Sequence, residues 1–186
     1  PLGYSAIMKN PAEFYMPATD AATGRATYFS KYDIVRDDYR AVMASCALPG
    51  FCRPVKVGDR YYYDGGVADS IPLHHAIEHG CTKMVVILSN PRDFVKKPEA
   101  HRPFYKHMLH KYPKTIQSID NRHINYQASI DLASRLEKEG YVFIFAPSRH
   151  MPLSTFSKDA ALEQDLYDLG VADYEARAEE LKYFLN

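Results

Sequence analysis

Short apolar and aromatic runs bounded by Gly, Pro, Asp or Asn recur along the first half of the chain and again near residue 140, which is typical of β-strands. The runs that predict strands span residues 14–19, 26–30, 53–57, 60–63, 83–88 and 141–145. Reverse-turn sequences separate the first two runs (Thr23-Gly24) and the next two (Gly58-Asp59), so each pair is expected to form a hairpin. The run at 83–88 is unbroken rather than alternating, which is typical of a strand buried on both faces of a sheet.

Longer stretches in which apolar residues return every three or four positions predict helices. The predicted helices span residues 40–47, 72–79, 102–112, 114–139, 160–169 and 174–185. The longest of them carries a single apolar stripe. The members of this stripe are Ile116, Ile119, His123, Tyr126, Ile130, Ala133 and Leu136. Gly80, Gly140 and Gly170 are expected to end helices, and Asp173 is expected to begin the last one.

The order of these elements predicts an α/β fold. Helix 72–79 lies between the strand at 61–63 and the strand at 83–88, an arrangement typical of a β-α-β crossover. We therefore expect 83–88 to lie beside the preceding hairpin and 141–145 to join the same sheet. The helices, 114–139 among them, are then expected to cover the faces of that sheet.

Composition narrows the class of protein without naming a function. Lys+Arg and Asp+Glu are both 23, so the net charge is zero, which argues against nucleic acid as a partner. The three cysteines are an odd number with no Cys-x-x-Cys pair, which favours reduced thiols and a cytoplasmic location. No apolar run reaches membrane-spanning length. At 186 residues, we expect one α/β domain over residues 1–150 and a C-terminal helical extension over residues 151–186.

Histidines are the first place to look for a metal site. His101, His107 and His110 lie close together, but no carboxylate or cysteine stands at ligand spacing from them. A solvated helix face is therefore the preferred interpretation, and we expect neither a bound metal nor a cofactor.

The candidate chemistry lies in the stretch from Arg40 to Pro72, centred on Asp64-Gly65-Gly66. A strand runs directly into a carboxylate and two glycines. One interpretation is an ordinary tight turn. The other is a reactive group presented at the end of a strand, where glycines let the backbone pass close to a ligand.

A second stretch upstream leaves the same two interpretations open. Thr19-Asp20 follows a predicted strand and precedes the Thr23-Gly24 turn. Both residues are candidates to line an active site. Alternatively, Asp20 accepts hydrogen bonds from backbone amides of the turn.

Together these stretches resemble the patatin-like phospholipase family. The matching features between residues 40 and 72 are the small-residue helix end Ala44-Ser45-Cys46-Ala47, Pro49, the Tyr-rich strand, Asp64-Gly65-Gly66 and the following proline. Pro17-Ala18-Thr19-Asp20 with Thr23-Gly24-Arg25 resembles another stretch of that family. The resemblance covers roughly residues 12–90. The strand at 141–145, the Pro-containing link after it and the two last helices resemble the C-terminal region of a bacterial cytosolic subgroup of patatin-like proteins. The family resemblance implies a three-layer α/β/α sheet, of which this chain carries a part.

The resemblance also implies a chemistry. In the family, a serine in a G-x-S-x-G turn attacks an acyl ester, and an aspartate is its only partner, so Asp64 takes the place of the base. Gly65, Gly66, Thr19, Asp20, Ser45 and Pro49 then take the places of the surrounding active-site motif. The implied partner is a lipid or other ester substrate, including one at a membrane surface, and no cofactor is implied. Ser70 stands where the family usually has Asn, which removes one anchoring group from the loop.

The serine of that pair has no counterpart in these residues. The nearest candidate, Gly3-Tyr4-Ser5-Ala6-Ile7, lacks the final glycine, and the Gly-rich oxyanion loop is absent. We therefore expect the chain to be the C-terminal part of a longer lipid acyl hydrolase, inactive by itself. The alternative is a non-catalytic patatin-like scaffold or lipid-binding module. A nucleotide-binding α/β domain is disfavoured because no G-x-G-x-x-G follows a strand.

Overall fold

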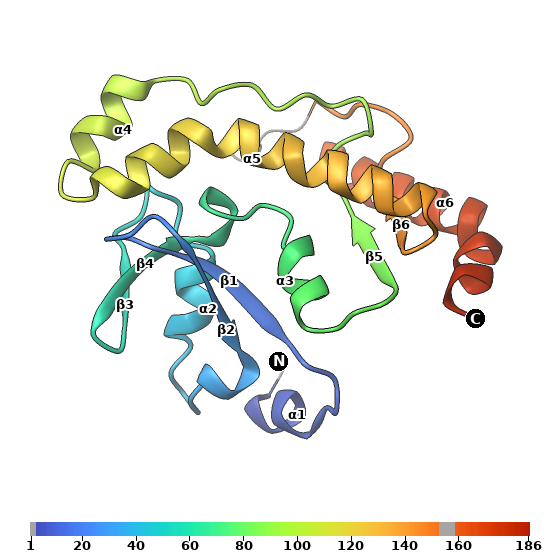
Figure 1. The fold of residues 1–186 in the computed structure, drawn as a ribbon, viewed down its shortest axis with the longest axis horizontal. Helices are drawn as coiled ribbons and strands as arrows, with labels where there is room; N and C mark the ends of the chain where they lie inside the picture. Colours follow the sequence, from blue (N-terminus) through green and yellow to red (C-terminus); the bar gives the residue numbers. More distant parts are fainter. Residues whose placement is uncertain (1–2, 153–158) are drawn as a thin grey trace. The chain divides into compact units, whose positions relative to one another are not determined.

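The computed structural model describes residues 3–152 and 159–186, and it is a mixed α/β structure (Figure 1). The α/β class expected from the sequence is confirmed. The elements group into two compact units. The first unit comprises residues 1–72 and 96–128, and the second comprises residues 73–95 and 129–186. Among the helices of the described residues, none combines the length and apolar character needed to cross a bilayer.

A four-stranded antiparallel sheet forms the centre of the first unit, with the strand order β2-β1-β4-β3 (Figure 1). The strands are β1 (Tyr15–Asp20), β2 (Ala26–Ser30), β3 (Val55–Val57) and β4 (Arg60–Asp64). Both expected hairpins are confirmed, since β1 pairs with β2 and β3 pairs with β4. Gly24 and Gly58 have positive φ values of 69° and 58°, which the two turns require and which glycine adopts without strain. The hairpins are joined by β1–β4 pairing, which sets Ala18 opposite Asp64.

The two faces of this sheet carry separate hydrophobic clusters, because successive residues of a strand point to opposite sides. Tyr62 packs into a cluster with helix α2 (Arg40–Ser45), and its ring centroid lies 4.9 Å from that of Phe29 in a T-shaped arrangement. Tyr63 packs into the other cluster, with α4 (Arg102–Met108) and the beginning of α5 (Pro113–Lys138). This unit therefore has a helix–sheet–helix arrangement.

Shorter elements complete the first unit. They are α1 (Tyr4–Lys9) and two 3-10 turns, η1 (Lys31–Asp33) and η2 (Gly65–Val67). Lys31 is buried, and its ammonium group donates to the carbonyls of Asn10 and Ala12 at 2.6 and 3.0 Å. A buried lysine needs such partners, so this residue anchors the segment between α1 and β1.

The second unit is built around two parallel strands, β5 (Met84–Ile87) and β6 (Val142–Phe145). It also holds α3 (Leu73–Glu78), the last part of α5, and α6 (Ala160–Leu185). Strand β6 is buried at Val142, Phe143 and Ile144. Its aromatic residues pack on α6, with ring centroids 5.7 Å apart for Phe143 and Phe184 and 6.1 Å apart for Phe145 and Tyr174.

The predicted single sheet is wrong, because β5 and β6 form a two-stranded sheet of their own. The β-α-β crossover from the strand at 61–63 to the strand at 83–88 is wrong for the same reason. Both edges of β4 are already hydrogen-bonded, one to β1 and one to β3, so β4 offers no edge to β5. Nor is 83–88 buried on both faces. Val85 and Ile87 are 40% and 79% exposed, while Met84 and Val86 are buried.

The predicted break between two C-terminal helices is also wrong, since α6 runs unbroken from 160 to 185 through Gly170 and Asp173. A glycine inside a helix costs about 1 kcal/mol relative to alanine, which tertiary packing readily offsets. Asp173 does not cap a helix but accepts a hydrogen bond from the Ser148 amide at 2.9 Å. Gly80 and Gly140 follow α3 and α5 with φ values of 80° and 81°, as expected. The division into domains at 150/151 stays a prediction.

The two turn glycines give a matched test of how closely α5 packs on the β1–β2 hairpin. A Cβ on Gly24 would lie 2.5 Å from the Lys114 carbonyl oxygen and 2.6 Å from Ser118 Oγ, whereas a Cβ on Gly58 meets nothing within 4 Å. Gly58→Ala is therefore expected to cost about 1 kcal/mol through backbone strain alone. Gly24→Ala adds a steric clash and is expected to cost about 3 kcal/mol or more. Urea unfolding followed by far-UV circular dichroism measures both, and equal losses would contradict the close contact.

Candidate active site

Asp64 ends β4 and is half-buried. Its backbone amide donates to the Ala47 carbonyl at 2.9 Å, and its carbonyl accepts from Thr19 Oγ1 at 2.7 Å. The side-chain Oδ1 accepts from the Gly66 amide at 2.8 Å and so caps η2. Within the described ranges, Oδ2 has no hydrogen-bond partner. One carboxylate oxygen is thus fixed while the other is available to accept a proton.

Gly65 is required by a close backbone approach. A Cβ at this position would lie 2.2 Å from the Pro17 carbonyl oxygen, a distance that no side chain tolerates. Ser45 Oγ donates to the same Pro17 oxygen at 2.7 Å and so ties α2 to this point. The Gly65 carbonyl accepts from the amides of Ala68 and Asp69. The backbone after Asp64 is therefore held tightly against β1.

Gly66 is anchored from the other side. Its carbonyl oxygen accepts from Arg122 Nε at 2.6 Å and from Ser70 Oγ at 2.7 Å. Arg122 also forms an ion pair with Glu99 at 3.0 Å. Ser70 therefore does bond this loop, and Arg122 adds a second anchor from α5.

Thr19 links the two ends of the Asp64 turn. It is fully buried, and its hydroxyl donates to the Asp64 carbonyl while accepting from the Ala68 amide at 3.2 Å. Its side chain contacts the backbone that carries the carboxylate, so it acts on the position of Asp64.

Asp20 does what the turn interpretation predicts. Its Oδ1 accepts from the amides of Ala22 and Thr23 at 3.0 and 2.8 Å, and its Oδ2 accepts from Arg60 at 2.9 Å. Burial would raise the pKa of Asp20, but the hydrogen bonds from Arg60 and Thr23 and the Arg60 charge hold that pKa below its usual range. Asp20 lies opposite Tyr62 in the β1–β4 register, away from the end of β4.

Two residues singled out in the sequence lie outside this hydrogen-bond network. Pro49 stands in the turn after α2, where it pairs with Cys52. Ser5 lies in α1, and its hydroxyl meets Arg36 at 3.5 Å. The structure therefore gathers Asp64, Gly65, Gly66, Thr19 and Ser45, and sets Asp20 and Pro49 at the edge of the group.

Sequence reasoning missed the polar face of α5. Thr115 Oγ1 donates to the Ala21 carbonyl at 2.8 Å, Ser118 Oγ donates to the Gly24 carbonyl at 2.7 Å, and Arg122 binds Gly66. The spacing of three and four residues places these side chains on one helical face. Three polar residues at that spacing beside an apolar stripe were the available signal.

Taken together, these contacts hold a carboxylate whose backbone is fixed by β1, α2 and α5. Such a group can accept a proton from a hydroxyl placed against Oδ2, because both its position and its orientation are set before a reactant arrives. Among the described residues, no group of three His, Cys, Asp or Glu side chains is arranged to hold a metal ion.

Comparison with known proteins assigns two segments of the chain. Residues 112–186 match the family model described as a domain of unknown function (DUF6363). Comparison with curated proteins found no match. Residues 13–77, which span the four-stranded sheet and the Asp64 turn, match the model of patatin-like phospholipases. The resemblance to patatin-like phospholipases inferred from the sequence is therefore confirmed for residues 13–77.

Proposed function

We propose that the chain supplies the aspartate half of a lipid acyl hydrolase, with Asp64 as the base of a Ser-Asp dyad. The patatin-like match supports a lipid hydrolase type of function in general. The observation that supports the finer assignment is the state of the Asp64 carboxylate: Oδ1 is bound by the Gly66 amide, while Oδ2 has no hydrogen-bond partner among the described residues. The proposed substrate is a carboxylic ester of a lipid, at a membrane surface in the cytoplasm.

In the proposed reaction, the serine hydroxyl gives its proton to Asp64 Oδ2 as its oxygen attacks the ester carbonyl carbon. The tetrahedral intermediate collapses to an acyl-enzyme, and the leaving alcohol takes the proton back. Water then gives a proton to the same carboxylate as its oxygen attacks the acyl carbon. The bond from that carbon to the serine oxygen breaks, the serine oxygen takes the proton back from Asp64, and the carboxylic acid leaves. Residues 1–186 contain no G-x-S-x-G sequence, so the proposal places the serine and the oxyanion donors outside these residues.

Arg122 is proposed as a positioning residue for this base. It touches Gly66 rather than any reacting atom, and Gly66 in turn supplies the amide that holds Asp64 Oδ1. A Cβ on Gly66 would lie 3.0 Å from that oxygen and 3.3 Å from an Arg122 nitrogen, so the three groups are packed together.

The rival function is a non-catalytic patatin-like scaffold or lipid-binding module. It assigns Asp64 the role of a turn residue, which the bond to the Gly66 amide also satisfies. The two functions can be distinguished by a substitution that prevents residue 64 from accepting a proton but keeps its hydrogen bond to the Gly66 amide.

Asp64→Asn in the full-length protein makes that separation. Asn keeps an acceptor oxygen for the Gly66 amide, so the melting temperature is expected to change little. It cannot take the serine proton, so ester hydrolysis is expected to fall about 10²- to 10⁴-fold. Turnover of a p-nitrophenyl ester, measured together with thermal unfolding, checks both expectations. Retained turnover at an unchanged melting temperature would contradict the assignment of Asp64 to a Ser-Asp dyad.

Residues 1–186 by themselves are expected to hydrolyse p-nitrophenyl esters no faster than background, because the nucleophile and the oxyanion donors are missing. The control is a Ser5→Ala variant treated in parallel with a serine-reactive phosphonate. Turnover that is abolished both by Ser5→Ala and by the phosphonate would show that Ser5 acts as the nucleophile and would contradict this expectation.

Arg122→Lys tests the positioning role. Lys has one nitrogen in place of the guanidinium fork and cannot hold both the Gly66 carbonyl and Glu99. In the full-length protein, Arg122→Lys is expected to lower kcat about tenfold with KM nearly unchanged. Arg122→Ala is expected to lower kcat further. The matched control is Arg135→Lys, at an exposed position of the same helix. A rise in KM with kcat unchanged would argue against positioning of the base.

A further inference from the structure

The second unit holds two adjoining hollows that the hydrolase chemistry does not use. One is a polar pocket with a volume of about 510 Å³, and the other is an apolar groove of about 410 Å³. Both volumes fall within the usual range for ligand sites. They share Phe145, Ala146, Pro147 and Asp173 in their walls, so they adjoin each other. The polar pocket lies past the carboxyl ends of β5 and β6, the place where parallel strands commonly present ligands.

The apolar groove runs between β5 and α6. Its walls include Val85, Ile87, Leu166 and Tyr174. Ile87 is 79% exposed and Tyr174 is 50% exposed, so this apolar surface faces water when the groove is empty. Gly170 lies in the same wall, and a Cβ there would meet nothing within 4 Å. The groove is therefore open along the helix and suited to a slender hydrocarbon chain.

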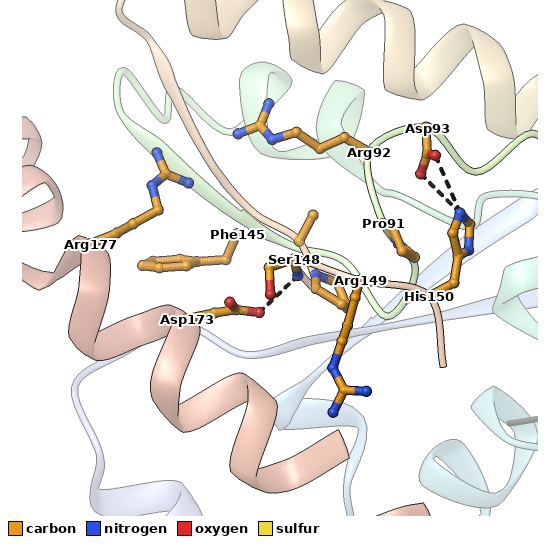
Figure 2. A pocket seen from close by; sticks show the side chains of 11 residues that line it. Pro91, Arg92, Asp93, Phe145, Ser148, Arg149, His150, Asp173 and Arg177 are labelled. Carbon is orange, nitrogen blue, oxygen red and sulfur yellow. Dashed lines mark hydrogen bonds and ion pairs between the residues drawn. The ribbon is translucent and has the colours of Figure 1, made fainter. Parts of the chain in front are cut away.

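The polar pocket is lined by three arginines from three different elements (Figure 2). Arg92 follows β5 and pairs with Glu137 at 2.6 and 2.7 Å, and these bonds hold the pKa of Glu137 below its usual range. Arg177 of α6 pairs with Glu180 at 2.9 Å.

Arg92 and Arg177 are fixed further by one backbone atom. Both donate to the Ile144 carbonyl, at 3.0 and 2.7 Å. Arg177 also lies over the ring of Phe143, with its guanidinium carbon 4.3 Å from the ring centroid. Each of these two positive charges is thus already compensated and held in place.

Arg149 differs from the other two arginines. It extends from the loop after β6, and it makes no ion pair with any residue that the structure describes (Figure 2). Two carboxylates also line the pocket: Asp93 meets the His150 ring at 3.1 Å, and Asp173 accepts from the neutral Ser148 amide. Arg149 is therefore the lining arginine without an ion-pair partner among the described residues, and the two nearby carboxylates disfavour a doubly charged anion more than a singly charged one.

We propose that the second unit binds a fatty carboxylate, with its hydrocarbon chain in the apolar groove and its head group at Arg149. The head group pairs with the lining arginine that lacks an ion-pair partner among the described residues, and the hydrocarbon chain covers the exposed apolar wall. This site is built from residues of the second unit alone, so it is independent of Asp64 and of the proposed hydrolysis.

Calorimetric titration of the chain with dodecanoate, below its micelle concentration, tests the proposal. We expect saturable binding of one molecule, weakened about tenfold for decanoate because two buried methylene groups are lost. Dodecanol, which lacks the charge, is expected to bind about tenfold more weakly, and dodecyl phosphate more weakly than dodecanoate.

Two variants with matched controls locate the site. Gly170→Phe is expected to abolish binding by filling the groove, while Ala172→Phe, at an exposed position of the same helix outside the groove, is expected to leave it unchanged. Arg149→Gln is expected to weaken binding about tenfold, while Arg135→Gln is not. If Gly170→Phe unfolds, Ile87→Asp replaces it, because Ile87 is largely exposed and lines the same groove.

Several outcomes would overturn the proposal. They are binding of many molecules per chain, equal affinity for dodecanoate and dodecanol, and full binding by folded Gly170→Phe or Ile87→Asp. Binding to neutral phosphatidylcholine vesicles that is as strong as binding to dodecanoate, and that survives Arg149→Gln, would assign the apolar surface to a membrane instead.

Discussion

The contact between Gly65 and the Pro17 carbonyl is the constraint on which the candidate site depends. The backbone of one strand end passes so close to β1 that no side chain fits between them. This closeness lets Thr19 reach the Asp64 carbonyl and the Ala68 amide with one hydroxyl. It also lets Ser45 bind the Pro17 oxygen from α2. The Asp64 carboxylate is oriented because these contacts fix the backbone that carries it.

Helix α5 supplies the second support of that backbone, and it comes from a different matched segment. Residues 112–186 match the domain of unknown function, yet Thr115, Ser118 and Arg122 donate to carbonyl oxygens within residues 13–77. All three acceptors lie at turns, where backbone carbonyls lack strand partners. The two matched segments therefore share one hydrogen-bonded structure in the first unit.

Local sequence patterns were sufficient for the hairpins and for most helices, because Gly24, Gly58 and Gly140 determine turns through their own backbone freedom. They were insufficient where distant segments compete. The sequence analysis placed the strand at 83–88 beside the hairpin that contains β4, but in the structure β1 pairs with the free edge of β4. No local sequence signal determines which strand takes that edge. Gly170 is a helix breaker by its own propensity, but α6 continues through it because β6 packs along the helix. Asp64 was found from its motif, whereas Arg122 was missed because its partner is distant in sequence.

The interleaving of the two units along the chain determines how the protein can be dissected. Each unit is made of two separate segments, so a single cut at any junction leaves both units incomplete or joined to part of the other. A truncation at residue 112, where the second family match begins, would remove the helical face that binds the Ala21, Gly24 and Gly66 carbonyls. Expression boundaries drawn from family matches would therefore yield pieces with exposed cores. Circular permutation, which relocates the termini without removing a segment, is the better way to separate the contributions of the two units.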